Sequence, residues 1–409
     1  MTQSDPHVII IGAGHAGGSA AAYLRQYGFA GPITLIGDEP AAPYQRPPLS
    51  KAWLKGETDA EALLLKPASF YAAHQIDLRL GVRATAIERS DRIVRLSSGE
   101  ALTYDHLVLA TGARARALPV PGADLDGVMA LRGMADAERL KAHLGPGRRL
   151  AVIGAGYIGL EVAASARALG GEAVVIEVQS RVLARVACPV LSDFFEAYHR
   201  DRGVTFALNA AVVGFEGEDG RVTGVRLNKG WVIACDAALV GIGAVPNDEL
   251  ARDAGLECVD GVVVGLSAQT ADPAVFAIGD VSHRPMPLYA RQFRLESVAN
   301  ALEQARQAAA VIAGRSLPPP EVTWNWSDQY DLKLQIAGLA LGADQVVVRG
   351  DPARAKFAVF HLKAGRMLAV EAVNAAPEFM AGRQLIASQR AVAPERLADL
   401  AVSMKEVAA

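Results

Sequence analysis

Two stretches of the sequence share one spacing of glycines, and that spacing suits the binding of a nucleotide phosphate. IIIGAGHAG runs from residue 9 to 17, and AVIGAGYIG runs from 151 to 159, about 140 positions later. Glycine lets the chain turn sharply after a strand and lets backbone N–H groups at a helix start approach a pyrophosphate, whose charge the helix dipole favours. We therefore predict one dinucleotide at each of two glycine sets, Gly12, Gly14 and Gly17, and Gly154, Gly156 and Gly159.

The residues around each motif predict a strand, a turn, a helix and a second strand that ends in an acidic residue. Around the first motif, the strands are expected at 8–11 and 33–36, and the helix between them ends at Gly28. Around the second motif, the strands are expected at 150–153 and 173–176. An acidic side chain about twenty residues past the last glycine is where ribose hydroxyls are held. One such motif alone is compatible with an ordinary glycine turn, but two complete units favour two dinucleotide sites. The acidic residues are Asp38 and Glu39, and Glu177.

The acidic residue of the second unit favours NADH. The carboxylate of Glu177 can accept both ribose hydroxyls of NADH, whereas it would repel the 2′-phosphate of NADPH. Arg181 and Arg185 follow shortly after Glu177, so NADPH also remains possible as the ligand.

The first unit is predicted to bind FAD because further buried strands with glycine turns belong to that half. LVLATGA (107–113) contains Thr111 and Gly112, and TADPAVFAIGD (270–280) ends in Gly279 and Asp280. At the carboxyl end of such a strand, an aspartate can meet the ribityl or pyrophosphate part of a flavin. The alternative is that Asp280 caps the next helix.

Composition and charge exclude other classes of protein. The 409 residues are 51% hydrophobic and 21% charged, with a formal net charge of −3, so two or three globular domains are expected and no global field attracts nucleic acid or membrane. The chain start lacks a signal-sequence pattern and no apolar run is long enough for a membrane helix, so a cytoplasmic location is expected. Cys188, Cys235 and Cys258 have no paired spacing and are interpreted as small buried side chains, and the eight histidines form no metal motif. We therefore predict no metal.

The motifs together resemble a known family. IGAGHAG, YQRPPLSK, LVLATGA, VIGAGYIGLE, FAIGD, ESVANALEQA and WNWSDQY occur in the order found in FAD-dependent, NADH-linked ferredoxin reductases of bacterial oxygenase systems, in the glutathione-reductase-like superfamily. The resemblance implies an α/β fold with two Rossmann-like dinucleotide-binding domains and a C-terminal α+β domain. The FAD domain would comprise 1–115 and 246–320, the NADH domain 116–245 and the third domain 321–409. Stretches rich in Pro and Gly near these crossings, and apolar runs at QVVVR, KFAVFHL and MLAVEAV, agree with that division.

The resemblance also implies a mechanism. Hydride passes from nicotinamide C4 to flavin N5, and two single electrons then leave for an iron–sulfur protein. The disulfide branch of the superfamily carries CxxxxC, but here residues 46–51 read RPPLSK, so electrons would leave the flavin directly. Lys51 would favour the electron-rich reduced flavin, with Glu161 as its partner. The alternatives are a solvated surface lysine and a carboxylate that merely complements a helix dipole.

Further contacts are implied by position in the family motifs. Tyr157 would cover the flavin until nicotinamide displaces it, Glu296 would hold the carboxamide, and Trp326 would lie beside the isoalloxazine edge. The alternatives are that Tyr157 only packs in the interior, that Glu296 is a structural carboxylate and that Trp326 lies in the core of a strand. For Arg46 and Arg132 the alternative is a surface ion pair. The sequence WNW at residues 324–326 departs from the more apolar sequence that is common in the family. The remaining FAD contacts would be Ala16, Asp38, Arg46, Ala84, Arg132, Asp280 and Val298, and the NADH set includes Ile158, Arg185 and Gly243.

The implied partner is a [2Fe–2S] ferredoxin, and no nucleic acid or membrane partner is expected. Ferredoxins of this kind are acidic, so a basic rim should steer their approach. The candidates are Arg291, Arg294, Arg306 and Lys405, with an ordinary solvated face as the alternative. The chain would be a monomer or a weak homodimer. Two other functions stay open, an NADH oxidase or peroxidase, and an NADH-responsive flavoprotein without turnover that resembles apoptosis-inducing relatives.

Overall fold

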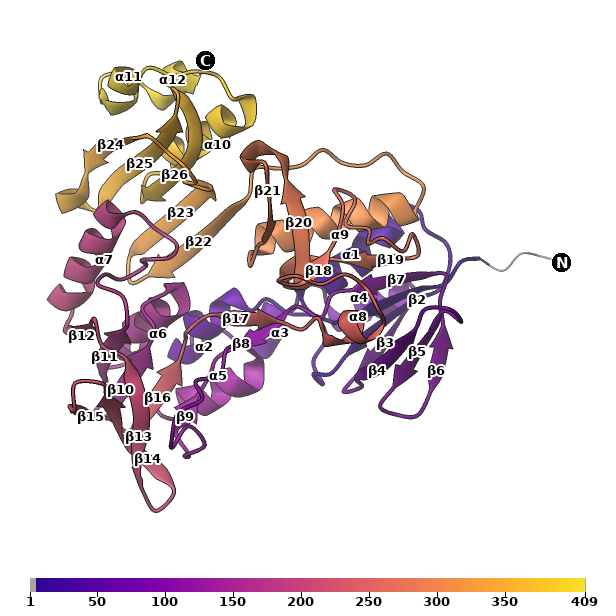
Figure 1. Cartoon of the computed structure of the whole chain (residues 1–409), viewed down its shortest axis with the longest axis horizontal. Coiled ribbons are helices and arrows are strands. Elements are labelled where there is room, and N and C mark those ends of the chain that lie inside the picture. Colours follow the sequence, from indigo (N-terminus) through magenta and orange to yellow (C-terminus); the bar gives the residue numbers. More distant parts are fainter. Residues whose placement is uncertain (1–4, 409) are drawn as a thin grey trace. The chain divides into compact units, whose positions relative to one another are not determined.

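The computed structural model describes residues 5–408 and divides into two compact units (Figure 1). The first unit comprises residues up to Gln45, Ala60–Arg114 and Val245–Thr323, and the second comprises Arg46–Asp59, Ala115–Ala244 and the chain from Trp324 onward. The three-domain division expected from the sequence stays a prediction. The expected lack of a signal sequence concerns a chain start that lies partly outside the described residues.

The first unit is built on a parallel five-stranded sheet with the order β19-β7-β1-β2-β3. Every residue of β1 is buried, and the pleat sends alternate side chains to opposite faces of the sheet. Val8 and Ile10 join one hydrophobic cluster, while Ile9 and Ile11 join another. This run is therefore apolar throughout, as expected for a strand covered on both faces. The strands are β1 (Val8–Ile11), β2 (Ile33–Gly37), β3 (Ile76–Leu80), β7 (His106–Leu109) and β19 (Val275–Ala277).

Two helices cover one face of this sheet, and a small antiparallel sheet covers the other. Helices α1 (His15–Gln26) and α9 (Val298–Ile312) meet in the cluster of Val8 and Ile10, and their contact residues are mostly alanines, which allow close approach. The predicted first helix ends two residues before Gly28, which has φ +84° in the following turn. On the other face lie β4 (Ala84–Glu88), β5 (Ile93–Leu96) and β6 (Ala101–Thr103).

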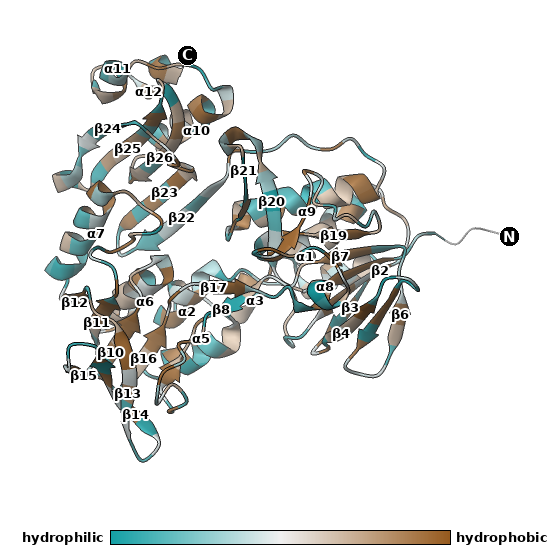
Figure 2. Ribbon diagram, in the orientation of Figure 1, coloured by the Kyte–Doolittle hydropathy of each residue, from teal (hydrophilic) through white to brown (hydrophobic). Residues whose placement is uncertain are grey.

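The second unit repeats this architecture. Its parallel sheet has the order β12-β11-β10-β16-β9, and an antiparallel sheet supplies Phe215, Val225 and Leu227 to the core on one face. Figure 2 shows β10 and β16 toward the hydrophobic end of the colour scale. The strands of the parallel sheet are β9 (Val128–Met129), β10 (Arg149–Ile153), β11 (Glu172–Glu177), β12 (Val204–Leu208) and β16 (Ala237–Val240). The antiparallel strands are β13 (Val212–Glu218), β14 (Arg221–Leu227) and β15 (Val232–Ala234), and the main helices are α5 (Met134–Lys141), α6 (Tyr157–Ala168) and α7 (Pro189–Asp201).

The second unit also contains the C-terminal sheet, which is antiparallel with the order β22-β23-β26-β25-β24. The three apolar runs seen in the sequence form β24 (Gln345–Asp351), β25 (Lys356–Lys363) and β26 (Arg366–Val373). The remaining strands are β22 (Trp324–Gln329) and β23 (Leu332–Gly338), and the helices are α10 (Ala376–Ser388), α11 (Pro394–Ala398) and α12 (Met404–Ala408). The predicted mixed α/β fold with a C-terminal α+β domain is confirmed.

Short elements complete both units. In the first unit they are α3 (Ala60–Leu63), α4 (Ala68–Ala73), α8 (Glu249–Asp253), β18 (Val262–Val263), β20 (Ser282–Met286), β21 (Arg291–Arg294) and the 3₁₀ turns η2 (Gly279–Val281) and η3 (Pro287–Tyr289). In the second unit they are η1 (Pro47–Ser50), α2 (Ala52–Lys55) and η4 (Pro352–Arg354), and the crossings between units fall in β8 (Ala113–Ala115) and β17 (Ala244–Pro246). Among residues 5–408, no helix has the length and apolar character to span a bilayer.

Candidate functional site

The first glycine turn joins β1 to α1, and its three glycines have different surroundings. Gly12 has φ +115°, and a Cβ there would clash with the carbonyl oxygen of Ala110. A Cβ at Gly17 would clash with the carbonyl oxygen of Gly12, so the helix could not pack so closely against the strand. Gly14 begins the helix, and a Cβ there would meet nothing within 4 Å. The turn therefore leaves open the position where backbone approaches a pyrophosphate, and it fits a dinucleotide.

The second glycine turn, between β10 and α6, has the same three environments. Gly154 has φ +103°, and a Cβ there would clash with the carbonyl oxygen of Gly241. A Cβ at Gly159 would clash with the carbonyl oxygen of Gly154, while one at Gly156 would meet nothing within 4 Å. Both motifs thus form the same local structure in different units.

The acidic residues at the ends of the second strands differ in their contacts. Glu177 ends β11, and its carboxylate accepts hydrogen bonds from the backbone N–H of Ala155 at 2.8 Å and of Gln179 at 2.9 Å. In the first unit, Glu39 accepts a 2.5 Å hydrogen bond from the Tyr44 hydroxyl, and exposed Asp38 pairs with Arg83 at 3.3 Å. Glu177 therefore lies at its glycine turn, with its carboxylate oriented by the backbone.

The two arginines after Glu177 have different contacts. Arg181 donates to the carbonyl oxygens of Ala184 and Ala187 and to the Ser192 hydroxyl. Its guanidinium is thus engaged by the protein. The Arg185 guanidinium lies over Gly243, where its Nη1 would be 3.2 Å from a Cβ.

Among the other predicted residues of the first unit, Thr111 and Gly112 lie just after β7, and Gly279 and Asp280 lie just after β19. Thr111 exchanges hydrogen bonds with Asn247, and Gly112 has φ +65°. Gly279 has φ +73°, and a Cβ there would lie 2.9 Å from the Cβ of Ala16, so these two residues lie together. Asp280 follows Gly279 in η2, Ala84 begins β4 and Val298 begins α9. Glu296, which was predicted to contact NADH, is exposed and pairs with Arg294 at 2.6 Å.

In the second unit, Lys51 and Glu161 form a buried ion pair. The Lys51 Nζ lies 2.6 Å from Glu161 Oε2, and the side chains are 17% and 5% exposed. Ser50 donates to the same oxygen at 2.5 Å, and Ser327 donates to Oε1 at 2.6 Å. The carboxylate therefore accepts two hydrogen bonds and forms one ion pair, and these three contacts offset the cost of burying its charge.

A buried chain of polar side chains continues from Glu161. Gln329 donates to the Ser327 hydroxyl at 3.0 Å, and His199 Nε2 lies 2.8 Å from Gln329 Oε1, which can only accept. Burial lowers the pKa of His199 to about 4. No sequence pattern identified Ser50, Ser327, Gln329 or His199 as part of this site, because only the fold brings them near Glu161.

The aromatic and arginine candidates of the second unit come from different segments of the chain. Arg46 donates to the carbonyl oxygen of Arg132 at 2.8 Å. Trp326 on β22 lies 5.5 Å, between ring centroids, from Trp324. The Tyr157 hydroxyl donates to the carbonyl oxygen of Val186 at 3.2 Å, and burial raises the pKa of this phenol. Ile158, the next residue on α6, is 44% exposed.

The four basic candidates for partner binding are not equivalent. Arg291 and Lys405 are exposed. Arg294 pairs with Asp260 and Glu296, and Arg306 pairs with Glu321. Two of the four charges are therefore already neutralised by neighbours.

The three cysteines are free thiols, and burial raises the pKa of each. The pKa of Cys235 rises to about 11, and this side chain is buried as expected, whereas Cys188 and Cys258 are partly exposed. The fold also brings Cys188 next to His361 and Glu371, a cluster that the sequence spacing did not reveal.

Two glycine turns of one geometry, each on a parallel sheet, define a protein that binds two dinucleotides. A family model described as pyridine nucleotide-disulphide oxidoreductase matches residues 6–305, and a model described as reductase C-terminal matches residues 324–408. The chain belongs to the pyridine nucleotide-disulphide oxidoreductase family.

Similar proteins share nearly the whole chain. A probable ferredoxin reductase from Castellaniella defragrans is 53% identical over 99% of both chains, and putidaredoxin reductase from Pseudomonas putida is 42% identical over 99% of this chain and 97% of that protein. The crystal structure of the covalent putidaredoxin reductase–putidaredoxin complex contains a chain with a TM-score of 0.97 and 42% identity, covering 99% of this chain and 98% of that one. The resemblance to ferredoxin reductases, and FAD with a nicotinamide dinucleotide as cofactors, are thereby confirmed.

Proposed function

We propose that this protein is an NADH-dependent ferredoxin reductase, which passes electrons from NADH through FAD, one at a time, to a [2Fe–2S] ferredoxin that feeds an oxygenase. The observation that carries this proposal is the pair of matching glycine turns, each with an open second glycine, in a chain whose relatives are ferredoxin reductases. When bound, FAD can accept two electrons together as hydride and release them one at a time.

The first glycine turn is proposed to hold FAD. Its open Gly14 lets the pyrophosphate reach the start of α1, where the helix dipole favours negative charge. The other FAD residues in this unit would be Gly12, Ala16, Gly17, Asp38, Glu39, Ala84, Thr111, Gly112, Gly279, Asp280 and Val298. From their positions in the family motifs, Arg46, Lys51, Arg132 and Trp326 complete the set.

The second glycine turn is proposed to hold NADH. Its Gly156 is open like Gly14, and the Glu177 carboxylate lies at the turn with one oxygen on the Ala155 N–H, positioned to accept ribose hydroxyls. The same carboxylate would repel a 2′-phosphate, which is why NADH is favoured over NADPH. The remaining NADH residues would be Gly154, Tyr157, Ile158, Gly159, Arg185, Gly243 and Glu296.

Lys51 and Glu161 are proposed to control charge at the flavin. A cation near the bound flavin would stabilise its electron-rich reduced form, and the two serine hydrogen bonds to Glu161 hold the ion pair in one geometry. No general acid, nucleophile or metal is required, because the protein has to orient the two nucleotides and manage charge.

The ferredoxin is proposed to approach through a basic surface that includes Arg291, Arg294, Arg306 and Lys405. Exposed Arg291 and Lys405 would contribute most to steering, since Arg294 and Arg306 already pair with carboxylates. We propose that the protein is cytoplasmic and is a monomer or a weak homodimer, which is compatible with this role.

The cysteines argue against an oxidase or peroxidase that uses a reactive thiolate. The pKa values of Cys188 and Cys235 rise to about 12 and about 11, mainly because the thiols are buried. Such thiols remain protonated near neutral pH and are poor nucleophiles.

Rapid mixing of the NADH-reduced holoprotein with a [2Fe–2S] ferredoxin, without oxygen, tests the proposal. The expected result is reduction of two ferredoxins per NADH, with a rate that falls as salt is added because charged surfaces steer the encounter. If the reduced protein persisted with ferredoxin present and were reoxidised rapidly only by oxygen or peroxide, the proposed function would change from a ferredoxin reductase to an NADH oxidase or peroxidase. A reduced form that is long-lived with every acceptor would indicate an NADH-responsive flavoprotein without turnover.

A further inference from the structure

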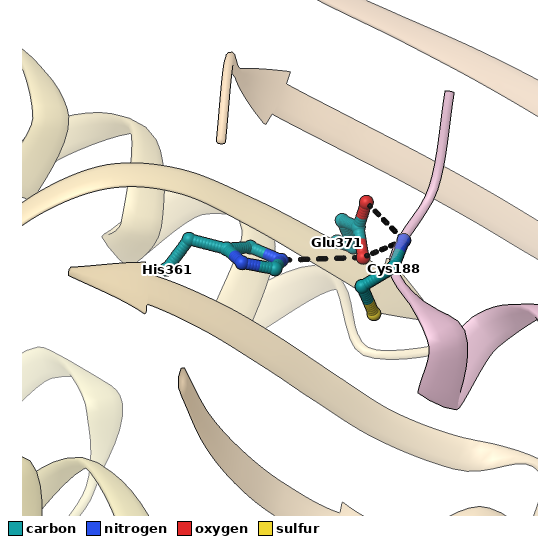
Figure 3. A group of neighbouring side chains, drawn as sticks. All are labelled: Cys188, His361 and Glu371. Atoms are coloured by element: carbon teal, nitrogen blue, oxygen red, sulfur yellow. Dashed lines mark hydrogen bonds and ion pairs between the residues drawn. The ribbon is translucent and has the colours of Figure 1, made fainter. Parts of the chain in front are cut away.

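Cys188, His361 and Glu371 form a compact group in the second unit (Figure 3). Cys188 immediately precedes α7, His361 lies on β25 and Glu371 lies on the adjacent strand β26. One ligand atom from each residue lies within 4.8 Å of the others. The imidazole points toward the carboxylate, and the Cys188 side chain lies beside it (Figure 3).

The geometry of the histidine and glutamate suits a shared metal better than a hydrogen bond. His361 Nε2 lies 3.3 Å from Glu371 Oε2, yet this buried nitrogen has no hydrogen-bond partner among the described residues. Zinc bonds of about 2.0–2.2 Å, at a tetrahedral angle, place a nitrogen and an oxygen ligand about 3.4 Å apart. This distance is an ion pair when His361 is protonated, and it also matches the spacing of two ligands on one ion.

The charges of the group also favour a divalent cation. His361 and Glu371 are each only 3% exposed, and the backbone N–H of Cys188 lies 3.2 Å from both carboxylate oxygens. A doubly charged cation compensates one thiolate and one carboxylate, which leaves a neutral buried site.

We propose that Cys188, His361 and Glu371 bind a Zn²⁺ ion. A thiolate, an imidazole and a carboxylate are the donor types that zinc takes, and three protein ligands leave a fourth position for water. Binding displaces the proton of the thiol, which goes to solvent, and no electron is transferred. Cys188 is partly exposed, so the ion can enter from its side. The ion would tie the start of α7 to the C-terminal sheet.

Equilibrium dialysis of the full-length, flavin-loaded protein against Zn²⁺ tests the site, after metal has been removed with a chelator. The expected result is one Zn²⁺ per chain, with affinity lowered more than about 100-fold in Cys188→Ser, a larger loss than for an outer-shell partner. Cys258→Ser is the matched control, because Cys258 is also a partly exposed thiol but lies in the first unit. Equal affinity in Cys188→Ser and wild type, or no stoichiometric binding, would overturn the proposal.

Cobalt provides a second readout that does not depend on comparing affinities. Co²⁺ in the wild-type site should give tetrahedral bands in the red, where oxidised flavin does not absorb, and a thiolate charge-transfer band that Cys188→Ser removes and Cys258→Ser keeps. Serine is a favourable residue before a helix and retains the N–H that contacts Glu371, so this variant should fold. Bound Co²⁺ without thiolate bands in the wild type would show that Cys188 is not a ligand.

Discussion

The two glycine turns of this chain have the same backbone design but different neighbours. Gly12 and Gly154 both have positive φ, and their third glycines both allow a helix to contact a strand. The two turns differ most in the exposure of the residue just before the third glycine. Ala16 is 7% exposed in the first turn, and Ile158 is 44% exposed in the second. We propose that the turn provides the phosphate site in both copies and that its surroundings decide how enclosed a bound nucleotide would be.

The neighbouring helices extend this contrast. Helix α1 packs on α9 within the first unit through buried alanines such as Ala20 and Ala305. Helix α6 begins with Tyr157 and exposed Ile158 and carries Glu161 one turn further on. We take the first copy as suited to a resident FAD and the second to an exchanging NADH.

The largest effect is expected from Gly12→Ala. The substitution forces alanine to φ +115° and into the carbonyl oxygen of Ala110, which costs about 1–3 kcal/mol for the backbone strain alone. The purified variant should have lost almost all of its flavin, as measured by absorbance per chain.

Gly154→Ala is the matched variant in the second turn. It should retain flavin and lose NADH binding, because Gly154 and Gly241, with which the new Cβ clashes, both lie in the second unit. If Gly154→Ala were colourless and Gly12→Ala yellow, the assignment of the two turns would have to be exchanged.

The next largest effect is expected from Lys51→Met. Removing the cation leaves the buried Glu161 carboxylate with only two serine donors, so the free energy of unfolding should fall by about 3 kcal/mol. Flavin reduction by NADH should slow about 100-fold in anaerobic stopped-flow measurements, as when one preorganised donor is removed.

Adding Glu161→Gln to Lys51→Met separates these two roles. The double variant should regain stability, since no buried charge is left unpaired, while reduction stays slow. A double variant as fast as the wild type would show that Lys51 acts only on folding.

A smaller effect is expected from Glu177→Ala. Loss of the ribose acceptor should lower kcat/KM for NADH about tenfold and narrow the preference over NADPH, with flavin content unchanged. Asp38→Ala in the first unit should instead affect flavin retention and leave the KM for NADH alone. Steady-state kinetics with both nucleotides measure the first effect, and an unchanged NADH-to-NADPH ratio would contradict the role of Glu177.

The smallest effect at neutral pH is expected from His199→Gln. His199 has its pKa lowered to about 4 in the folded protein, so the unfolded chain binds more protons as pH falls below about 6.5. The wild type should therefore lose up to about 3 kcal/mol of stability between pH 6.5 and 4 from this residue, and none above pH 7. As the pH falls across this range, the unfolding midpoint should decline less steeply in His199→Gln than in the wild type. Equally steep declines would show that His199 is not the source of the pH dependence.

The glycine turns could be predicted from the sequence because their signal is local. Strand, glycines, helix and acidic residue lie within about 30 residues of each other, and each has its own physical reason for its residue type. The C-terminal strands β24 to β26 were visible for the same reason, as short apolar runs between turns.

The surroundings of Glu161 and Cys188 could not be predicted in this way. Ser327 is 166 residues from Glu161, and Glu371 is 183 residues from Cys188, so no spacing in the sequence reports their contact. The pairing of Arg294 and Arg306 with carboxylates was hidden for a related reason, since Asp260 lies 34 residues from Arg294 on a separate loop. These contacts depend on tertiary packing, which local pattern does not encode.

Anaerobic titration of the purified protein with NADH, followed by absorbance, tests most directly that one nucleotide is resident and the other exchanges. We predict one FAD per chain that survives gel filtration and is fully reduced by one equivalent of NADH, with NAD⁺ separable afterwards. A colourless protein, or a bound flavin that stays oxidised with excess NADH, would contradict the account.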